Sequence, residues 1–243
     1  MHIIKLSATD STNTYLRNLC NEENLKDYTV IVTNQQTKGR GQMGSVWESE
    51  ADKNLIFSVF KDLSEFIIEH SFYLSMIVSL SILDALKKMA IHNLWIKWPN
   101  DILSDNKKIC GILIENVVKN NKLSSTIIGI GLNVNQLEFN NLPNAASLKS
   151  ATGINHNLDE LLINILGSLI FKFDLYKKGE FVEFKQKYEE SLYGINRPSS
   201  FQDKNGKLFQ GIIQGVTNSG KLNILLEDNV IKAFDHKEAI LKY

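Results

Sequence analysis

Apolar residues along the chain follow two different spacings. Short runs rich in β-branched side chains predict strands over residues 2–6, 29–33, 54–60, 94–98, 110–115 and 124–133. Longer apolar stretches predict helices over residues 71–90, 157–178 and 180–193. We expect a further helix to begin at Asp10-Ser11-Thr12-Asn13 and to run to about Cys20, because such side chains cap free backbone N–H groups.

The predicted elements are bounded by residues that suit their ends. The helix over 157–178 has Asp159 in its first turn, lysines in its last turn and Gly179 beyond it. A polar turn at 104–107 lies between the strands predicted at 94–98 and 110–115. This arrangement predicts that the two strands form a hairpin.

The pattern changes after Gly194. Short strands then alternate with tight turns at a spacing of roughly ten residues, which is typical of a small barrel, and the turns contain Asn205-Gly206, Ser219-Gly220 and Asp228-Asn229. A barrel of about 50 residues is only marginally stable alone, so we expect it to pack on the larger domain. The sequence therefore predicts an α+β fold: a domain at 1–194 with a mixed sheet and packed helices, and a small barrel domain at 195–243.

Composition excludes several classes of protein. Hydrophobic residues make up 43% and charged residues 22% of the chain, as in ordinary globular proteins. The 27 basic and 27 acidic residues balance, whereas a general nucleic-acid binder usually has a basic excess. Two cysteines form no disulfide framework, and five histidines without ligand spacing argue against a zinc site. Without a signal peptide or an apolar run near 18 residues, we expect a cytoplasmic protein with no membrane contact.

One arginine stands in an unusual place. The chain has three arginines against 24 lysines, and Arg40 lies between Gly39 and Gly41, with Gly44 close behind. Glycine allows a backbone to approach a ligand closely, and the guanidinium offers paired donors to a carboxylate or phosphate. This combination predicts a loop that closes on an anion.

Known glycine loops have the same spacing but a different context. A dinucleotide-binding loop opens a helix, whereas this loop leads into the strand predicted at 54–60. A kinase loop requires His-Arg-Asp and Asp-Phe-Gly motifs, which do not occur, and a P-loop requires Lys-Ser/Thr where this chain has Ser45-Val46. The loop alone is also compatible with an ordinary turn. The neutral side chains at 33–37 suit either a polar ligand head or a solvated loop.

Further motifs connect the loop to a known family. Lys97-Trp98-Pro99-Asn100-Asp101 is followed by Lys108 and Gly111, and later by Gly129-Ile130-Gly131-Leu132-Asn133. Together with Asp10-Ser11-Thr12-Asn13 and the Gly39-Arg40-Gly41 loop, these motifs resemble those of the biotin protein ligases, in the same order and over essentially the whole chain. The resemblance implies a biotin/lipoate ligase-like catalytic fold, related to that of class II aminoacyl-tRNA synthetases, followed by an SH3-like barrel.

The resemblance also implies a reaction. Biotin and ATP form biotinyl-5′-AMP, and a lysine of a biotin carboxyl carrier protein domain then attacks it to give an amide. Mg²⁺ is implied because the triphosphate charge must be neutralised. Larger members of the family carry a DNA-binding helix-turn-helix before the catalytic region, and this chain starts close to Asp10, so we expect a ligase without a DNA-binding role. Both a monomer and a homodimer remain open.

The resemblance assigns roles to individual residues. Those expected to catalyse the reaction are Arg40, Lys108 and Asp101. Those expected to bind biotin are Ser11, Thr12, Gln36, Gly39, Arg40, Gly41, Lys108, Gly111 and Ile112. Those expected to bind ATP or the adenylate are Arg40, Gln42, Met43, Trp47, Asn100, Lys108 and Asn133. The sequence identifies no metal ligands.

Some of these positions allow a purely structural role. Ser11 and Thr12 are also suited to cap a helix, and Gly111 and Gly131 to pack within strands. Trp47 is expected in a pocket wall or the core rather than against adenine.

Two features leave alternatives open. Many members of the family have arginine where this chain has Gln42, and often again at Ser45, so retention of the adenylate is in question. A lipoate or octanoate ligase shares the catalytic fold, and a non-catalytic biotin-binding module is a further alternative.

Overall fold

The computed structural model describes residues 1–140 and 142–242. The strands of the larger sheet are β1 (His2–Thr9), β2 (Thr29–Gln36), β3 (Leu55–Asp62), β4 (Leu94–Lys97), β5 (Asp101–Ser104), β6 (Lys107–Lys119) and β7 (Lys122–Leu132). The α-helices are α1 (Thr12–Glu22), α2 (Ser71–Lys88), α3 (Leu148–Thr152), α4 (Leu158–Lys177) and α5 (Phe181–Glu190). Short 3₁₀ turns occur at η1 (Gln42–Gly44) and η2 (Ile68–His70). The C-terminal strands are β8 (Pro198–Gln202), β9 (Leu208–Val216), β10 (Leu222–Leu226), β11 (Ile231–Phe234) and β12 (Ile240–Lys242).

The larger sheet is mixed, as the sequence predicts. Its seven strands run in the order β1-β2-β3-β7-β6-β5-β4. The β1–β2 pair is parallel and the other neighbours are antiparallel. The α+β fold class is therefore confirmed.

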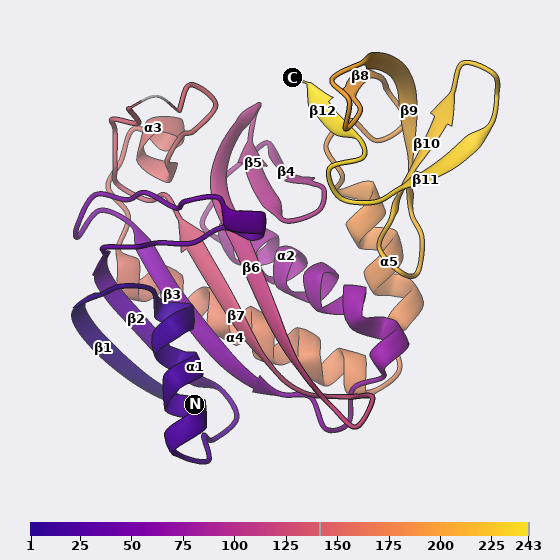
Figure 1. The fold of residues 1–243 in the computed structure, drawn as a ribbon. Helices are drawn as coiled ribbons and strands as arrows, with labels where there is room; N and C mark the ends of the chain where they lie inside the picture. The colour runs from indigo at the N-terminus through magenta and orange to yellow at the C-terminus, as the bar shows by residue number, and fades with distance from the viewer. Residues whose placement is uncertain (141, 243) are drawn as a thin grey trace.

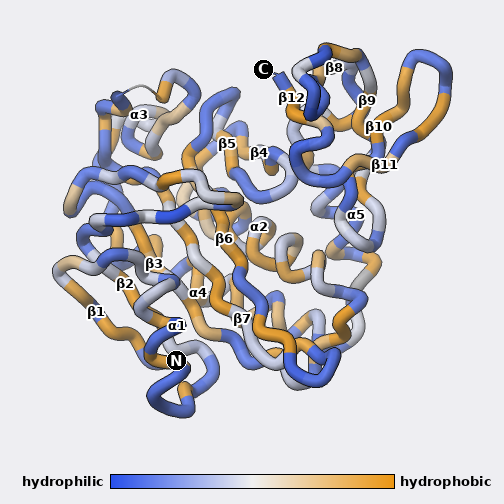
Figure 2. Tube along the Cα trace, viewed as in Figure 1, coloured by the Kyte–Doolittle hydropathy of each residue, from blue (hydrophilic) through white to orange (hydrophobic). Residues whose placement is uncertain are grey.

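Helices cover the two faces of this sheet unequally. Figure 1 shows α1 on one face, against β2, β3 and β7, and α2 and α4 on the other. The main core lies between the sheet and α2 and α4, where the apolar segments in Figure 2 converge. Helix α2 is apolar nearly all round because it lies between the sheet and the neighbouring helices. Its Ser79 and Ser81 are fully buried, which fits close packing.

The pairing of the strands toward the β4 edge of this sheet differs from the prediction. The sequence predicts a direct hairpin between 94–98 and 110–115, but β5 lies between them and pairs with both β4 and β6. The polar turn therefore joins β5 to β6. Four residues are too few for β5 to produce a recognisable alternation, and its Asp101 and Ser104 resemble turn residues.

The C-terminal strands form a separate antiparallel sheet in the order β11-β10-β9-β8-β12. Phe201, Phe209 and Phe234 stack in its interior. Trp98 in the larger sheet region donates an indole hydrogen bond of 2.9 Å to the carbonyl of Gly220. Buried residues of both sheets belong to one continuous core, so the division into domains at residue 194 stays a prediction.

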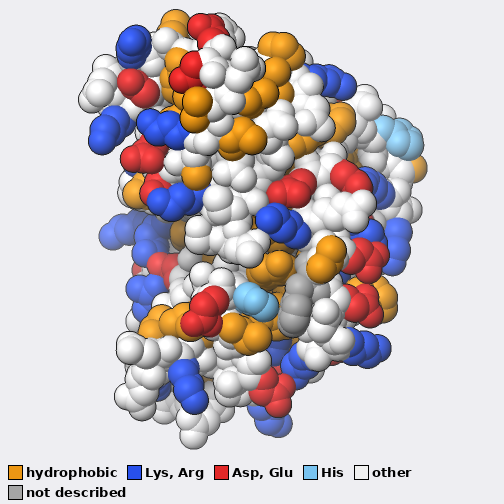
Figure 3. Space-filling view, turned by 90° about the vertical axis from the view of Figure 1, so that its right-hand side faces the viewer, with side chains coloured by type: hydrophobic (Ala, Val, Ile, Leu, Met, Phe, Trp, Pro, Cys, Tyr) orange, Lys and Arg blue, Asp and Glu red, His pale blue; other side chains and the backbone are white. Residues whose placement is uncertain are grey.

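The surface is mixed in charge. On the face drawn in Figure 3, basic and acidic side chains are interspersed, as expected for a chain of zero net charge. Among the described residues, no helix has both the length and the apolar character needed to span a membrane.

Candidate active site

A cavity of about 520 Å³ opens above β3, β6 and β7, beside the start of α1. We call the segment 39–47 the flap, and its residues 40–47 line part of the cavity. Figure 1 shows this segment in front of the larger sheet. Thirteen predicted site residues line the cavity: Ser11, Thr12, Gln36, Arg40, Gly41, Gln42, Met43, Trp47, Asn100, Asp101, Lys108, Gly111 and Ile112. Residues from five separate segments of the chain therefore meet in one place.

The flap is a tight hairpin. The Gly41 amide donates to the Ser45 carbonyl at 2.7 Å, and the Trp47 amide donates to the Gly39 carbonyl at 3.0 Å. A Cβ at Gly39 would lie 2.2 Å from the Trp47 carbonyl oxygen, and one at Gly41 would lie 2.4 Å from Ser45 Oγ. Here the two glycines around Arg40 allow the flap strands to approach each other.

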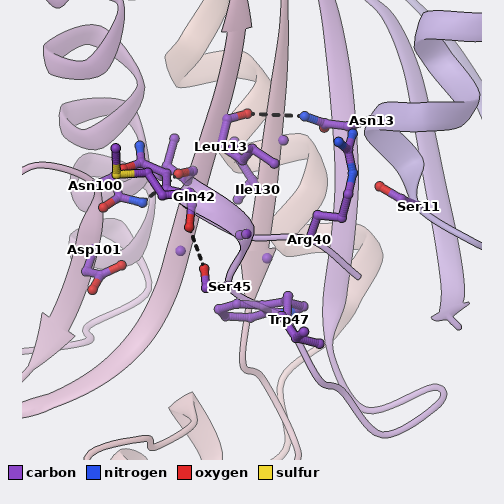
Figure 4. Close-up of a pocket in the computed structure, with 18 of the residues that line it drawn as sticks. Ser11, Asn13, Arg40, Gln42, Ser45, Trp47, Asn100, Asp101, Leu113 and Ile130 are labelled. Atoms are coloured by element: carbon purple, nitrogen blue, oxygen red, sulfur yellow. Dashed lines mark hydrogen bonds between the residues drawn. The ribbon is translucent and has the colours of Figure 1, made fainter. Parts of the chain in front are cut away.

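Trp47 lies flat against the floor of the cavity (Figure 4). A Cβ at Gly131 would lie 2.5 Å from its ring, and one at Gly111 would lie 2.9 Å away. The absence of side chains at these two glycines therefore accommodates an indole in this conformation. The buried Nε1 of Trp47 has no hydrogen-bond partner among the described residues. It is a free donor at the cavity wall.

Hydroxyl and amide groups gather at the end of the cavity next to α1. The Thr12 amide and Oγ1 lie 2.8 Å and 3.1 Å from Gln36 Oε1. Ser11 is 3% exposed and its side chain makes no capping bond to α1, whereas Asp10 accepts from the Ser11 amide at 2.6 Å. Capping therefore does not occupy the Ser11 hydroxyl, which lies beside the cavity (Figure 4).

Asn13 is a site residue that the sequence analysis treated only as part of a helix start. Its Nδ2 donates to Glu115 Oε2 at 2.8 Å, and its Oδ1 accepts from Ser58 Oγ at 2.5 Å. A Cβ at Gly129 would lie 2.3 Å from Asn13 Oδ1, so only glycine leaves room there. The position of Asn13 within the Asp-Ser-Thr-Asn motif is the signal that could have revealed it.

Each of the two cations expected to act in catalysis has a carboxylate partner. Arg40 Nη2 lies 3.3 Å from Glu115 Oε2, and Arg17 binds the same carboxylate from α1 at 2.5 Å. Lys108 Nζ lies 2.6 Å from Asp101 Oδ1 and 5.6 Å from the Trp47 ring centroid. Both cations thus face one cavity, as predicted, from opposite ends.

Burial affects the titration of groups near Lys108. It lowers the pKa of the Lys97 ammonium, with a smaller opposing effect from Asp101. Burial also raises the pKa of the Cys110 thiol well above its usual range. Cys110 therefore remains a neutral core residue next to the site.

Two predicted residues do not line the cavity. Gly39 lies at the base of the flap. Asn133 is 4% exposed, and its Nδ2 donates to the Ala146 carbonyl at 3.0 Å. In this position the Asn133 side chain ties β7 to the segment before α3. The sequence could not distinguish this structural role of Asn133 from contact with a nucleotide. An asparagine that follows a glycine-rich strand is compatible with both roles.

The remaining lining residues have simpler roles. Asn100 Nδ2 donates to the Ile112 carbonyl at 2.8 Å, which fixes the loop between β4 and β5. Met43 is 66% exposed, and the Gln42 carbonyl accepts from Ser45 Oγ at 2.8 Å. His236 and Lys237, from the C-terminal sheet, also line the cavity and were not predicted.

Comparisons with known proteins identify the family to which the chain is similar. The model of the biotin/lipoate A/B protein ligase family matches residues 6–133. The bifunctional ligase/repressor BirA of Bacillus subtilis is 30% identical over 233 residues, which cover 94% of this chain and 70% of that protein. The biotin–[acetyl-CoA-carboxylase] ligase of Mycobacterium tuberculosis is 31% identical over 125 residues, or 50% of this chain and 45% of that protein.

A solved structure matches nearly the whole chain. The biotin protein ligase of Aquifex aeolicus in complex with biotin and ATP has a TM-score of 0.82 and 31% identity, covering 99% of this chain and 98% of that one. The chain therefore belongs to the biotin/lipoate A/B protein ligase family, and within it to the biotin protein ligases.

Proposed function

We propose that the protein joins biotin to ATP as biotinyl-5′-AMP and then transfers biotin to a lysine of a biotin carboxyl carrier protein domain. The protein is a biotin–[acetyl-CoA-carboxylase] ligase that binds biotin and ATP. The observation that carries the proposal for this chain is that Arg40 and Lys108 line one cavity together with Ser11, Thr12 and Gln36.

In the first step, the biotin carboxylate attacks the α-phosphorus and pyrophosphate leaves. Two anions must approach each other, so cationic donors fixed beside them lower the barrier. Arg40 and Lys108 both line the cavity, which supports this role for them. In the proposed step, each exchanges its contact with a carboxylate for a contact with the substrates. The Trp47 ring packs on Gly111 and Gly131 in the wall of the same cavity.

Biotin recognition is proposed for the end of the cavity next to α1. The ureido ring is uncharged and presents both N–H donors and a carbonyl acceptor. Hydroxyls and amides supply both kinds of partner, and Ser11, Thr12 and Gln36 provide them. The Thr12 bonds fix the Gln36 carbonyl oxygen toward α1, which leaves its NH₂ group as the free donor.

In the second step, the neutral amine of the carrier lysine attacks the acyl carbon and AMP leaves. The nitrogen gives up one proton and keeps the other as the amide N–H. Asp101 is the proposed base or electrostatic partner of this amine. Its position in the cavity lining and its ion pair with Lys108 support this role. When Lys108 turns to phosphate, the Asp101 carboxylate is released for the incoming ammonium.

Mg²⁺ is proposed to enter with the nucleotide. Mg²⁺ in nucleotide sites is usually held by substrate phosphates, waters and one or two carboxylates. Asp101 is a carboxylate that lines the cavity. No cluster of three or more metal-binding side chains occurs among residues 1–140 and 142–242, so we assign no further ligands.

Gln42 is proposed to shorten the retention of the adenylate. It lines the cavity from the flap where many relatives place an arginine, and an amide supplies hydrogen bonds without a charge. Gln42→Arg is expected to lengthen the half-life of bound biotinyl-5′-AMP after gel filtration. An unchanged half-life would exclude this explanation.

The decisive experiment is biotin-dependent exchange of labelled pyrophosphate into ATP, followed by transfer to an apo carrier domain and detection with streptavidin. Exchange that depends on biotin and not on lipoate supports the proposal. Exchange with lipoate alone would indicate the lipoate branch of the family. Binding of biotin without any exchange would indicate a non-catalytic module.

A further inference from the structure

A turn of the C-terminal sheet reaches the cavity of the larger sheet. The turn at 235–238 joins β11 to β12, and its two basic residues, His236 and Lys237, line the cavity. The sequence analysis assigned no role to this turn.

The turn has a defined shape. The Glu238 amide donates to the Asp235 carbonyl at 3.0 Å, and the Asp235 amide donates to Glu238 Oε2 at 2.9 Å. Buried Phe234 and Ala239 anchor its two ends. Lys237 has a φ of 69°, in the left-handed region that side chains other than glycine and asparagine rarely adopt. The turn therefore holds Lys237 in a backbone conformation that glycine adopts without strain.

Charges within the turn are separated. Asp235 pairs with Lys221 at 2.7 Å, and Glu238 is occupied by the backbone of the turn. Neither acidic residue lines the cavity, whereas both basic residues do. The basic residues of the turn, His236 and Lys237, therefore line the cavity, whereas its carboxylates contact Lys221 and the turn backbone.

His236 holds the turn against the catalytic motif. Its ring meets the Trp98 ring edge-on, with 6.0 Å between centroids. Burial and neighbouring Lys237 lower the pKa of the His236 imidazole, and Asp101 opposes them. His236 is therefore electrostatically coupled to the end of the cavity that holds Asp101 and Lys108.

The other cavity cations already have carboxylate partners. Arg40 contacts Glu115, and Lys108 contacts Asp101. No ion pair involves Lys237 in the part of the chain that the structure describes. Figure 4 places Ser11 and Asn13 on one side of the cavity and Asn100 and Asp101 on the other. If biotin occupies the side next to α1, the polyphosphate extends toward Asp101 and the turn.

We propose that Lys237, positioned by the turn and with His236 beside it, binds the polyphosphate of ATP and the pyrophosphate product. This inference rests on the proposed function for the direction of the nucleotide. It makes the C-terminal sheet a direct contributor to the first step.

The test compares Lys237→Gly with Lys237→Arg in the full chain. Glycine removes the charge and suits the left-handed backbone, so the turn should keep its shape. We expect Lys237→Gly to weaken binding of inorganic pyrophosphate in calorimetry and to raise the KM for ATP, each by roughly three- to tenfold. Lys237→Arg should stay within about twofold of wild type, because it keeps the cation.

The control is Lys232→Ala, on exposed β11 of the same sheet, which does not line the cavity. Unchanged pyrophosphate binding in Lys237→Gly would overturn the inference. A raised KM for the carrier domain with normal pyrophosphate binding would also overturn it, since the turn would then face the carrier. Calorimetry needs no turnover, so its result is independent of whether biotin-dependent exchange occurs.

Discussion

Lys108 Nζ lies 2.6 Å from Asp101 Oδ1 because a β-bulge turns Lys108 toward the cavity. The register of β5 and β6 shifts between Ile102 and Leu103, so that Ile109 and Cys110 are both fully buried. Without the bulge, strict alternation would direct Lys108 into the core. The bulge therefore brings the Lys108 ammonium and the Asp101 carboxylate to one face.

Lys108→Ala is expected to lower the rate of adenylate formation by about 10- to 150-fold. A charge-assisted hydrogen bond in a desolvated site contributes roughly 1.5–3 kcal/mol, and a factor of ten corresponds to about 1.4 kcal/mol. Biotin-dependent pyrophosphate exchange measures this rate. The control is Lys107→Ala, one residue earlier at an exposed position. Near-normal exchange in Lys108→Ala would contradict the assignment.

Arg40→Ala is expected to lower adenylate formation by a similar factor of about 10 to 150, because Arg40 is the second cation of the cavity. Arg17→Ala is the matched comparison, since Arg17 contacts the same Glu115 carboxylate without lining the cavity. Its exchange rate should remain within about tenfold of wild type. If both variants lost the same factor in exchange rate, the ion pairing of Glu115 would control the rate, rather than the Arg40 guanidinium itself.

Gly131→Ala is expected to slow adenylate formation by roughly 10- to 100-fold, the range seen when catalytic groups are misplaced by about 1 Å. The new Cβ would lie 2.5 Å from the Trp47 ring, so the indole and the flap must move. Gly167→Ala in α4 is the control, because no atom lies within 4 Å of its added Cβ. Wild-type exchange in Gly131→Ala would show that contact between Trp47 and the floor is dispensable.

Asn133→Ala is expected to destabilise the protein with little effect on the KM for ATP. The substitution leaves the Ala146 carbonyl without its side-chain donor, at a cost of about 1–3 kcal/mol in the free energy of unfolding. Urea unfolding and ATP kinetics of the same variant separate the two effects. Asn116→Ala, at an exposed position of β6, provides the control. A higher KM with unchanged stability would instead favour direct nucleotide contact.

Stability is expected to fall as the pH decreases below about 6.5, in part because of His156. Burial lowers the pKa of this imidazole below its ordinary value of 6.5, and Glu160 only partly opposes the shift. The unfolded chain then binds a proton more readily than the folded one, so acid favours unfolding. The contribution is fully present above the unfolded pKa and is lost as the pH falls toward the folded one. Urea unfolding at several pH values should show a smaller decline for His156→Gln, with His92→Gln, at an exposed position, as the control. An equally steep decline in both variants would contradict this role.

The sequence by itself determined most helices, most strands and the set of residues expected in the site. Long helices such as α2 and α4 can be predicted because their apolar spacing and their terminal residues are local properties of the sequence. The motifs around Arg40 and Lys108 indicate which side chains to expect in the site. Tertiary structure decided the rest: β5 between its neighbours, the network of Asn13 and Glu115, the position of Trp47 on Gly131, and the approach of Lys237. These are contacts between residues far apart in the chain, and no local pattern records which distant strand, glycine or turn will lie opposite a given side chain.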